Sequence, residues 1–470
     1  MRAVRSILVL CLLLALAAGI YVFVAWRPAI APIAPPSAGG FDAALVQRGA
    51  TLAAIGDCAV CHTAPGGRVL AGGLALPTPF GTVFSTNITP DAETGIGGWS
   101  EAAFQRAMRQ GIRRDGAYLY PAFPYDHFTL VTDDDDRALY AYLMTRQPVH
   151  ATAPANTLPF PLNVRLVMFG WDLLFLHQGP YRADAAQNET WNRGAYLAEG
   201  LGHCGACHTP RNVLGAEKTG RKFAGGEAEG WTAYALNSSS PAPVRWNAPA
   251  LDHYLGQGWD ELHGVARGPM APVTEDLHAA PPDDVRAIAV YVATQIGEPA
   301  APPQPLERHA QKQAGRGKAA AAASADSQAV TIGAGATTGG GDGALIYAAA
   351  CAGCHEGPRA LPYGGIDLAL SSGISGPSAK NLANVVLYGL PAAAGARSPI
   401  MPGFAAAMDD AQLAALAAYL RGHFSDKGPW RDVDESVREA RSAQTAPVVN
   451  HAPAAPSDPT QRTTHGETQR

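Results

Sequence analysis

The chain contains three pairs of segments in which apolar residues recur with helical spacing, and the three pairs have similar sequences. The first member of each pair is rich in small and apolar residues, and the second begins with acidic residues and ends in an aromatic one. Acidic side chains favour a helix N-terminus, where they accept hydrogen bonds from free N–H groups and interact with the dipole. The pattern predicts helices within 45–57 and 132–145, within 192–203 and 281–294, and within 343–350 and 408–422.

A third segment of each copy carries signals for the two ends of a helix. A polar residue that can cap the N-terminus is followed by an apolar stretch and then by a glycine. In the first two copies a tryptophan precedes the capping residue. The expected caps and closing glycines are Ser100 with Gly111, Asp260 with Gly268, and Ser378 with Gly389.

The N-terminus contains an uncharged apolar run from Ile7 to Trp26, preceded by two arginines. About 20 apolar residues suffice to cross a bilayer as a helix, and arginine before the run predicts a cytoplasmic N-terminus. We expect residues 1–27 to form an uncleaved anchor in the inner membrane of a bacterium. The alternative is a signal peptide that is cleaved near Ala15–Ala18. Both interpretations place the rest of the chain in the periplasm.

Six of the seven cysteines form three Cys-x-x-Cys-His motifs, at 58–62, 204–208 and 351–355. Two thiols at this spacing can form thioethers with the two vinyl groups of one haem, and the adjacent histidine reaches the iron from the proximal side. Zinc would need two such pairs in one site, whereas these lie about 146 residues apart. The motifs predict three covalent haems c, attached through Cys58 and Cys61, Cys204 and Cys207, and Cys351 and Cys354. His62, His208 and His355 would be the proximal ligands.

The second axial ligand of each iron must come from another part of the chain. Met270 and Met401 lie beside prolines, 21 and 18 residues before the aromatic residue of the last helix in their copies. Prolines stiffen a loop that has to hold a thioether on iron, so we expect these two methionines to be distal ligands.

The corresponding position of the first copy is occupied by Phe123, 19 residues before Tyr142. We expect His127 to replace the missing methionine. The alternatives are Met108, Met144, an iron without a sixth ligand, and a histidine that is only part of a loop.

These motifs predict an all-α fold, with three cytochrome c-like helical domains in tandem after the N-terminal anchor. The expected domains are 42–150, 186–298 and 342–425. The remaining segments are an inter-domain segment with an apolar helix (151–185), a flexible linker rich in Pro, Ala and Gly (299–341) and a mostly disordered tail (426–470). Within the inter-domain segment, the apolar stretch 161–181 predicts either a core helix or an interfacial helix that contacts a membrane or a partner.

Four further stretches resemble the tri-haem c-type cytochrome subunits of bacterial membrane-bound dehydrogenases. They are "FGTVFSTNITPDAETGIGGW" (80–99), "DGAYLYPAFPYDHFT" (115–129), "PLNVR" (161–165) and "GIDLALSSGISGPSAKNLANVVLYGL" (365–390). Such cytochromes serve molybdenum hydroxylases that oxidise aldehydes, nicotinate or isoquinoline-like rings, and also quinoprotein alcohol and flavoprotein sugar dehydrogenases. In the latter group the position of Phe123 more often carries methionine, so the resemblance favours the molybdenum hydroxylase group.

The resemblance implies an electron-transfer subunit without a catalytic site of its own. Electrons would come from a catalytic dehydrogenase subunit, with or without an iron–sulfur subunit, and pass through three haems to ubiquinone or another respiratory acceptor in the membrane. A haem peroxidase is the alternative of another class, and only an open site at haem 1 would permit it. The net charge of −5 and the pI of about 6.3 give no indication of a nucleic-acid partner.

Overall fold

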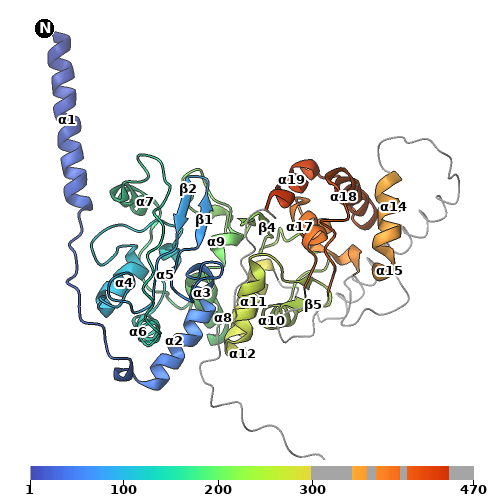
Figure 1. Ribbon diagram of the computed structural model, residues 1–470, viewed down its shortest axis with the longest axis horizontal. Helices are drawn as coiled ribbons and strands as arrows, with labels where there is room; N and C mark the ends of the chain where they lie inside the picture. The colour runs from blue at the N-terminus through green and yellow to red at the C-terminus, as the bar shows by residue number, and fades with distance from the viewer. Residues whose placement is uncertain (1, 298–340, 357–366, 392–399, 444–470) are drawn as a thin grey trace, which may run out of the picture.

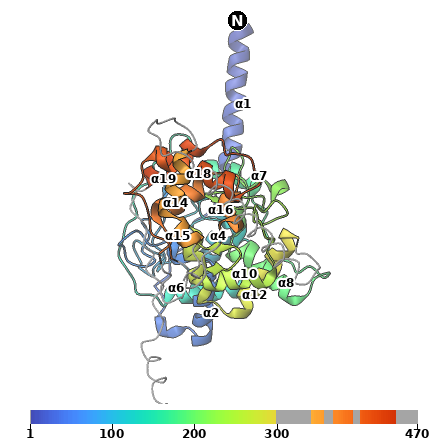
Figure 2. The same ribbon diagram turned by 90° about the vertical axis from the view of Figure 1, so that its right-hand side faces the viewer.

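The computed structural model describes residues 2–297, 341–356, 367–391 and 400–443. Its described part is mainly helical, with three short two-stranded antiparallel sheets. The body consists of three parts in a row, coloured blue to cyan, green to yellow, and orange to red in Figure 1. A long N-terminal helix stands away from the first part (Figures 1 and 2). The sheets are too short to change the helical class, although the all-α expectation did not include them.

Each part contains one pair of long crossing helices, and we call the parts unit 1, unit 2 and unit 3. Their helices correspond to the six predicted segments. The pairs are α2 (Ala43–Ile55) with α6 (Asp133–Met144), α8 (Glu189–Tyr196) with α12 (Pro282–Ile296), and α14 (Gly341–Ala350) with α18 (Asp410–Phe424). In unit 2, a π-helical turn, Leu197–Leu201, continues α8 toward the second cysteine motif.

A glycine allows the backbones to approach at each crossing. A Cβ atom on Gly49, Gly194 or Gly343 would lie well inside 3.0 Å of a backbone carbonyl oxygen of the partner helix. The carbonyl belongs to Ala138, Ala287 or Ala415, four residues before the tyrosine of each predicted aromatic ending. The same crossing therefore occurs three times at equivalent positions.

A capped helix packs beside each pair. These helices are α4 (Glu101–Gln110), α10 (Ala248–Gln257) and α17 (Lys380–Tyr388). The predicted cap Ser100 and the closing glycines Gly111 and Gly389 are confirmed: Ser100 accepts a hydrogen bond from Ala103 N, and the two glycines end α4 and α17. The predicted cap of α17 was wrong by one residue: Ala379 is the N-cap, and Ser378, which precedes it, accepts a hydrogen bond from Lys380 N.

The prediction for the second copy was wrong. Trp259–Asp260 forms strand β5, which pairs with β6 (Gly264–Val265), and the helix lies earlier in the chain. Its cap is Asn247, which follows Trp246 and accepts a hydrogen bond from Ala250 N, and its closing residue is Gly258. Trp246–Asn247 and Trp259–Asp260 both combine a tryptophan with a capping residue, and the earlier of these two pairs begins the helix.

The remaining elements are short. They are α3 (Cys58–Cys61), β1 (Ala75–Thr78), β2 (Gly81–Phe84), α5 (Tyr125–Phe128), α7 (Met168–Phe175), α9 (Gly205–His208), β3 (Gly226–Ala228), β4 (Trp231–Ala233), α11 (Met270–His278), α15 (Ala352–His355) and α16 (Ser372–Ser375). A last helix, α19 (Val433–Ala443), packs against α17 and α18, and buries Val437 and Ala440. This helix falls within the segment that was expected to be a disordered tail. Residues 444–470 and the expected linker 299–340 lie outside the described residues.

The first helix, α1 (Arg2–Ala25), is long and apolar enough to cross a membrane. Its last turns contact the body. Tyr21 donates a hydrogen bond to Leu166 O, and Ala25 is fully buried with its carbonyl accepting from Tyr118 Oη. The following residues run along unit 1, where Ile30 N donates to Arg114 O.

Candidate haem sites

Each Cys-x-x-Cys-His motif forms a single helical turn, α3, α9 or α15, directly after the first helix of its unit. In two motifs a backbone carbonyl orients the histidine ring. His62 Nδ1 lies 2.6 Å from Thr86 O, and His208 Nδ1 lies 2.6 Å from Tyr234 O. A carbonyl can only accept, so Nδ1 carries the proton and Nε2 keeps a lone pair. This is the tautomer that a metal-ligating histidine needs. Nothing in the sequence marks Thr86 or Tyr234, because any residue type supplies a backbone carbonyl.

The first cysteine of each motif packs against the apolar cluster of its own unit: Cys58 in unit 1, Cys204 in unit 2 and Cys351 in unit 3. Burial raises the pKa of Cys58 and of Cys204 to about 12, so both thiols are neutral at physiological pH. Neutral thiols in apolar surroundings are not prepared for dithiol redox chemistry, which requires a thiolate. They fit attachment to a large apolar cofactor by thioether bonds.

The position predicted for the distal ligand has the same spacing from the capped helix in all three units. Phe123, Met270 and Met401 each stand twelve residues after the glycine that ends the capped helix: Gly111, Gly258 and Gly389. Each of the three side chains packs on the same apolar cluster as the first cysteine of its unit. The structure thus brings Met270 and Met401 to equivalent places in units 2 and 3, and it puts Phe123 at that place in unit 1.

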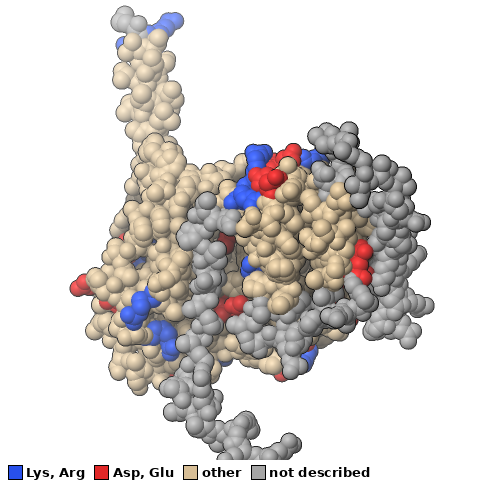
Figure 3. Space-filling model, turned by 45° about the vertical axis from the view of Figure 1, so that its right-hand side comes forward, with Lys and Arg blue, Asp and Glu red and all other residues tan. Residues whose placement is uncertain are grey.

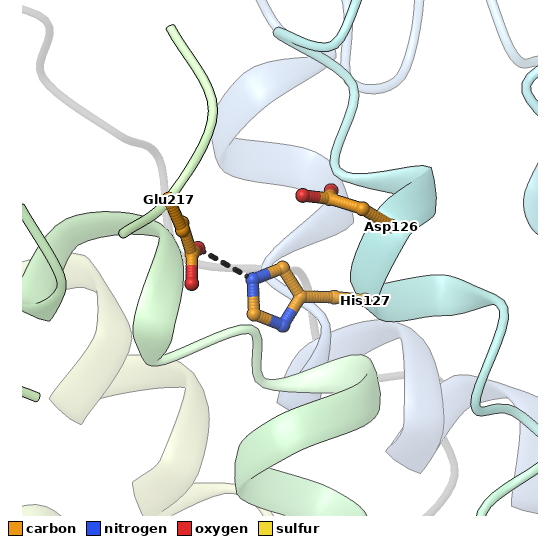
Figure 4. Close-up of side chains that lie close together, drawn as sticks. All are labelled: Asp126, His127 and Glu217. Carbon is orange, nitrogen blue, oxygen red and sulfur yellow. Dashed lines mark hydrogen bonds and ion pairs between the residues drawn. The ribbon is translucent and has the colours of Figure 1, made fainter. Parts of the chain in front are cut away.

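His127 is 8 % exposed and lies on α5, at the junction of units 1 and 2. Its Nδ1 is 2.6 Å from Glu199 O, and its Nε2 is 2.7 Å from Glu217 Oε1. Figure 4 shows the imidazole between Glu217 and Asp126. Both partners accept hydrogen bonds, so both ring nitrogens donate and neither offers a lone pair to iron. This arrangement does not support the expectation that His127 is the distal ligand of haem 1.

The electrostatics of His127 agree with a charged ring. Burial alone would lower the pKa of His127, but the hydrogen bond to Glu217 and the negative charge of Asp126 outweigh it and raise the pKa to about 9. The bond to His127 in turn lowers the pKa of Glu217, although burial acts in the opposite direction. A buried imidazolium–carboxylate pair thus connects unit 1 with unit 2.

The other methionines of the described body are core residues. Met108 and Met144 are buried in the same cluster that contacts Cys58 and Phe123. Met168 is buried in α7, and Met408 is buried beneath α18. Both methionine alternatives for haem 1, Met108 and Met144, therefore lie in the apolar cluster of the correct unit.

Unit 1 contacts the motif of unit 2. A Cβ atom on Gly205, within that motif, would lie 3.0 Å from Cε1 of His127. Units 2 and 3 meet through β4 and α17: Asn381 accepts a hydrogen bond from Thr232 N and donates one to Thr232 O. Tyr234, whose carbonyl orients His208, also contacts unit 3 at Gly376. Unit 2 therefore contacts both neighbours with segments that adjoin its own motif.

The sequence matches two families over the first and last units. Residues 46–147 match the family "Cytochrome c", and residues 340–420 match "Cytochrome C oxidase, cbb3-type, subunit III". The cytochrome subunit of fructose dehydrogenase from Gluconobacter japonicus is 35% identical over 411 residues, which cover 84% of this chain and 82% of that protein. The chain belongs to the family of cytochrome c subunits of dehydrogenases.

Two further members show the range of this family. The gluconate 2-dehydrogenase cytochrome c subunit of Pantoea cypripedii is 35% identical over 86% of this chain and 90% of its own length. A nicotinate dehydrogenase subunit from Pseudomonas putida is 46% identical over 89% of this chain. The chain spans only 33% of that longer protein. As a cytochrome subunit of this family, the chain transfers electrons, and its partner enzyme differs from member to member.

Proposed function

We propose that this chain carries electrons through three covalently bound haems c, one in each unit. The main support is the threefold recurrence of one arrangement: a glycine crossing, a Cys-x-x-Cys-His turn, and a side chain twelve residues after a capping glycine. The cysteine pairs would attach the cofactors, and His62, His208 and His355 would be the proximal ligands. Haem iron supplies one-electron redox chemistry, while the protein sets distance, burial and axial ligands.

The distal ligands would differ between the units. Met270 and Met401 would complete a His/Met pair in units 2 and 3, and such ligation raises the reduction potential of haem iron. In unit 1, Phe123 cannot ligate, and His127 is committed to Glu199 and Glu217. The alternatives that stay within the apolar cluster of unit 1 are Met108 and Met144. Met108 or Met144 would give haem 1 the same His/Met pair from another part of the unit, whereas an iron without a sixth ligand would set haem 1 apart in spectrum and in potential.

The order of the haems follows the order of the chain in this proposal. Unit 2 lies between units 1 and 3 in Figure 1, and it contacts unit 1 through its motif and unit 3 through Tyr234, whose carbonyl orients His208. Electrons would then pass haem 2 on any path between the ends. Unit 1 contacts the base of α1 and would face the membrane acceptor, ubiquinone or another respiratory carrier. Unit 3, at the opposite end, would receive electrons from the dehydrogenase.

The proposed partner is a separate catalytic subunit of the molybdenum hydroxylase type, with or without an iron–sulfur subunit. The support is the 46% identity to the nicotinate dehydrogenase subunit, against 35% for the fructose and gluconate dehydrogenase cytochromes, together with Phe123. An aldehyde or an N-heterocycle would be the substrate of that partner. A quinoprotein alcohol or flavoprotein sugar dehydrogenase is the alternative, since cytochrome subunits of those enzymes are about a third identical over similar lengths.

The test is stepwise reduction of the purified chain. The complex is isolated from native membranes, and its large subunit is identified by mass spectrometry. The substrate of the large subunit is then mixed with the cytochrome, with and without that subunit. We expect haem reduction only when the subunit is present, and reoxidation on adding a quinone analogue. Haem reduction by the substrate alone, or rapid turnover of peroxide by the isolated chain, would overturn the proposal.

A further inference from the structure

Large apolar side chains are exposed around one short helix of the body. Outside α1 and the residues that follow it, nine large apolar side chains of the described residues are more than a third exposed, and six of them lie in or beside α7. These six are Phe160, Val164, Leu173, Leu174, Val213 and Leu214. Contiguous exposed apolar surface on a soluble body marks a contact with a membrane, a ligand or a protein.

α7 has one face in the core and one face outside. Met168, Phe169 and Trp171 are buried against unit 1, whereas Leu173 and Leu174 are 69% and 63% exposed. The single ionisable residue of the helix, Asp172, is turned toward the body, where Tyr125 Oη donates to it at 2.7 Å. The outward face of α7 is therefore both apolar and uncharged.

The neighbouring loop extends this face. Trp171 Nε1 donates a hydrogen bond to Leu214 O at 3.1 Å, which fixes the loop that carries Val213 and Leu214 beside α7. Val213 is 90% exposed. In Figure 3 the surface at the base of α1 is tan, and the blue and red side chains of this part of the body lie lower down.

The contacts of Tyr21 fix the position of α7 along the axis of α1. Tyr21 Oη donates to Leu166 O and accepts from Gly170 N, and its ring packs edge-on against Phe169 at 5.5 Å. Figures 1 and 2 both show α7 beside the base of α1. α1 ends at Ala25, four residues or about 6 Å of helix after Tyr21 at 1.5 Å per residue, and Arg27, two residues farther on, is the first charge after the apolar run. α7 therefore lies beside a part of α1 that still belongs to the apolar run.

We propose that the outward face of α7, formed by Leu173 and Leu174, lies in the boundary between head groups and acyl chains of the bilayer that α1 crosses. Interfacial helices bury their apolar face by about 5–10 Å at this boundary, which agrees with the level set by Tyr21. The inference rests on the proposal that α1 remains in the chain as an anchor. The proposed contact of α7 with the bilayer fixes the orientation of the body, because unit 1 then lies on the membrane surface.

Thiol labelling in proteoliposomes tests the proposal on the full haem-loaded chain without its partner enzyme. Leu173→Cys and Leu174→Cys are made in a Cys11→Ala background, because Cys11 is a free thiol within α1. The control is Val69→Cys, an apolar position that is 46% exposed and lies about 100 residues before α7 in the chain. In water alone the two leucine positions should react at least as fast as position 69, since they are more exposed. Haem content by mass spectrometry confirms that every variant is folded and loaded.

In proteoliposomes, with a water-soluble maleimide, we expect the cysteines at 173 and 174 to react at least about 10-fold more slowly than the cysteine at 69. Equal rates would overturn the proposal. Fast labelling in liposomes but slow labelling in native membranes with the dehydrogenase would also overturn it, because a protein partner would then cover this face. Alkaline carbonate extraction of the same samples separates the two premises: release of the chain refutes the anchor and this inference together, whereas retention with fast labelling refutes the α7 contact alone.

Discussion

Replacing His127 with alanine distinguishes a structural ion pair from an iron ligand. The ordinary pKa of histidine is about 6.5, and the pair with Glu217 raises the pKa of His127 to about 9. A shift of this size corresponds to about 3 kcal/mol of stability, at 1.36 kcal/mol per unit. The side chain is 10% exposed, so solvent screens the interaction little. We expect His127→Ala to lower the free energy of unfolding of units 1 and 2 by about this amount at pH 6.

The sign of the pH dependence follows from the direction of the shift. A histidine whose pKa is raised by folding contributes its full stabilisation below the unfolded value of about 6.5, and this contribution disappears as the pH rises through about 9. The difference between the wild type and His127→Ala should therefore be largest at pH 6 and should become much smaller at pH 10.

Urea unfolding at pH 6, 8 and 10, followed by tryptophan fluorescence, measures this difference. The matched control is His150→Ala. His150 is also near a carboxylate, Asp91 at 3.6 Å, but its side chain is 64% exposed, so the change should stay within about 0.5 kcal/mol. Haem spectra and midpoint potentials are recorded on the same samples. Equal stabilities with an altered spectrum of one haem would refute the ion-pair reasoning and establish His127 as a ligand.

Three further substitutions test the equivalence of the units. Phe123→Met places a thioether where units 2 and 3 have one, so a spectroelectrochemical titration should show a changed midpoint for one haem, and an upward change if that iron has no sixth ligand in the wild type; three unchanged midpoints would contradict the alignment. Met401→His should lower one midpoint by on the order of 0.1 V, whereas Met408→Leu, in the core beside it, should move none. Gly343→Ala should destabilise unit 3 by about 1–3 kcal/mol because its Cβ meets the Ala415 carbonyl. Gly422→Ala in the same unit has free space and should be neutral or stabilising, so equal effects of the two glycines would rule out the crossing contact.

The helix pairs could be predicted from the sequence because their signals are long and repeated. The segments that became α6, α12 and α18 combine acidic first turns with an apolar stripe, and the structure confirms all three helices. The short hairpins could not be predicted, since strands of two to four residues have too few positions to show alternation. α19 was missed because its polar residues resemble a solvated tail, and burial of Val437 and Ala440 depends on contacts that only the fold supplies.

The environment of His127 shows what sequence spacing cannot provide. Glu199 and Glu217 lie 72 and 90 residues away in the chain, so nothing near His127 indicates that both ring nitrogens have partners. The position of Phe123 was predicted by counting back from Tyr142, and the spacing of twelve residues from Gly111 supports it independently. Counting from the capping glycines also corrects the second unit, where Trp246 and Asn247 take the place assigned to Trp259 and Asp260.

The most direct test of the three-haem electron path is the number of covalent haems per chain. The pyridine haemochrome assay and the intact mass of the purified protein should both give three. The paired variants Cys58→Ala with Cys61→Ala, Cys204→Ala with Cys207→Ala, and Cys351→Ala with Cys354→Ala should each give two. A wild-type count other than three, or a cysteine pair whose loss leaves the count unchanged, would contradict this path.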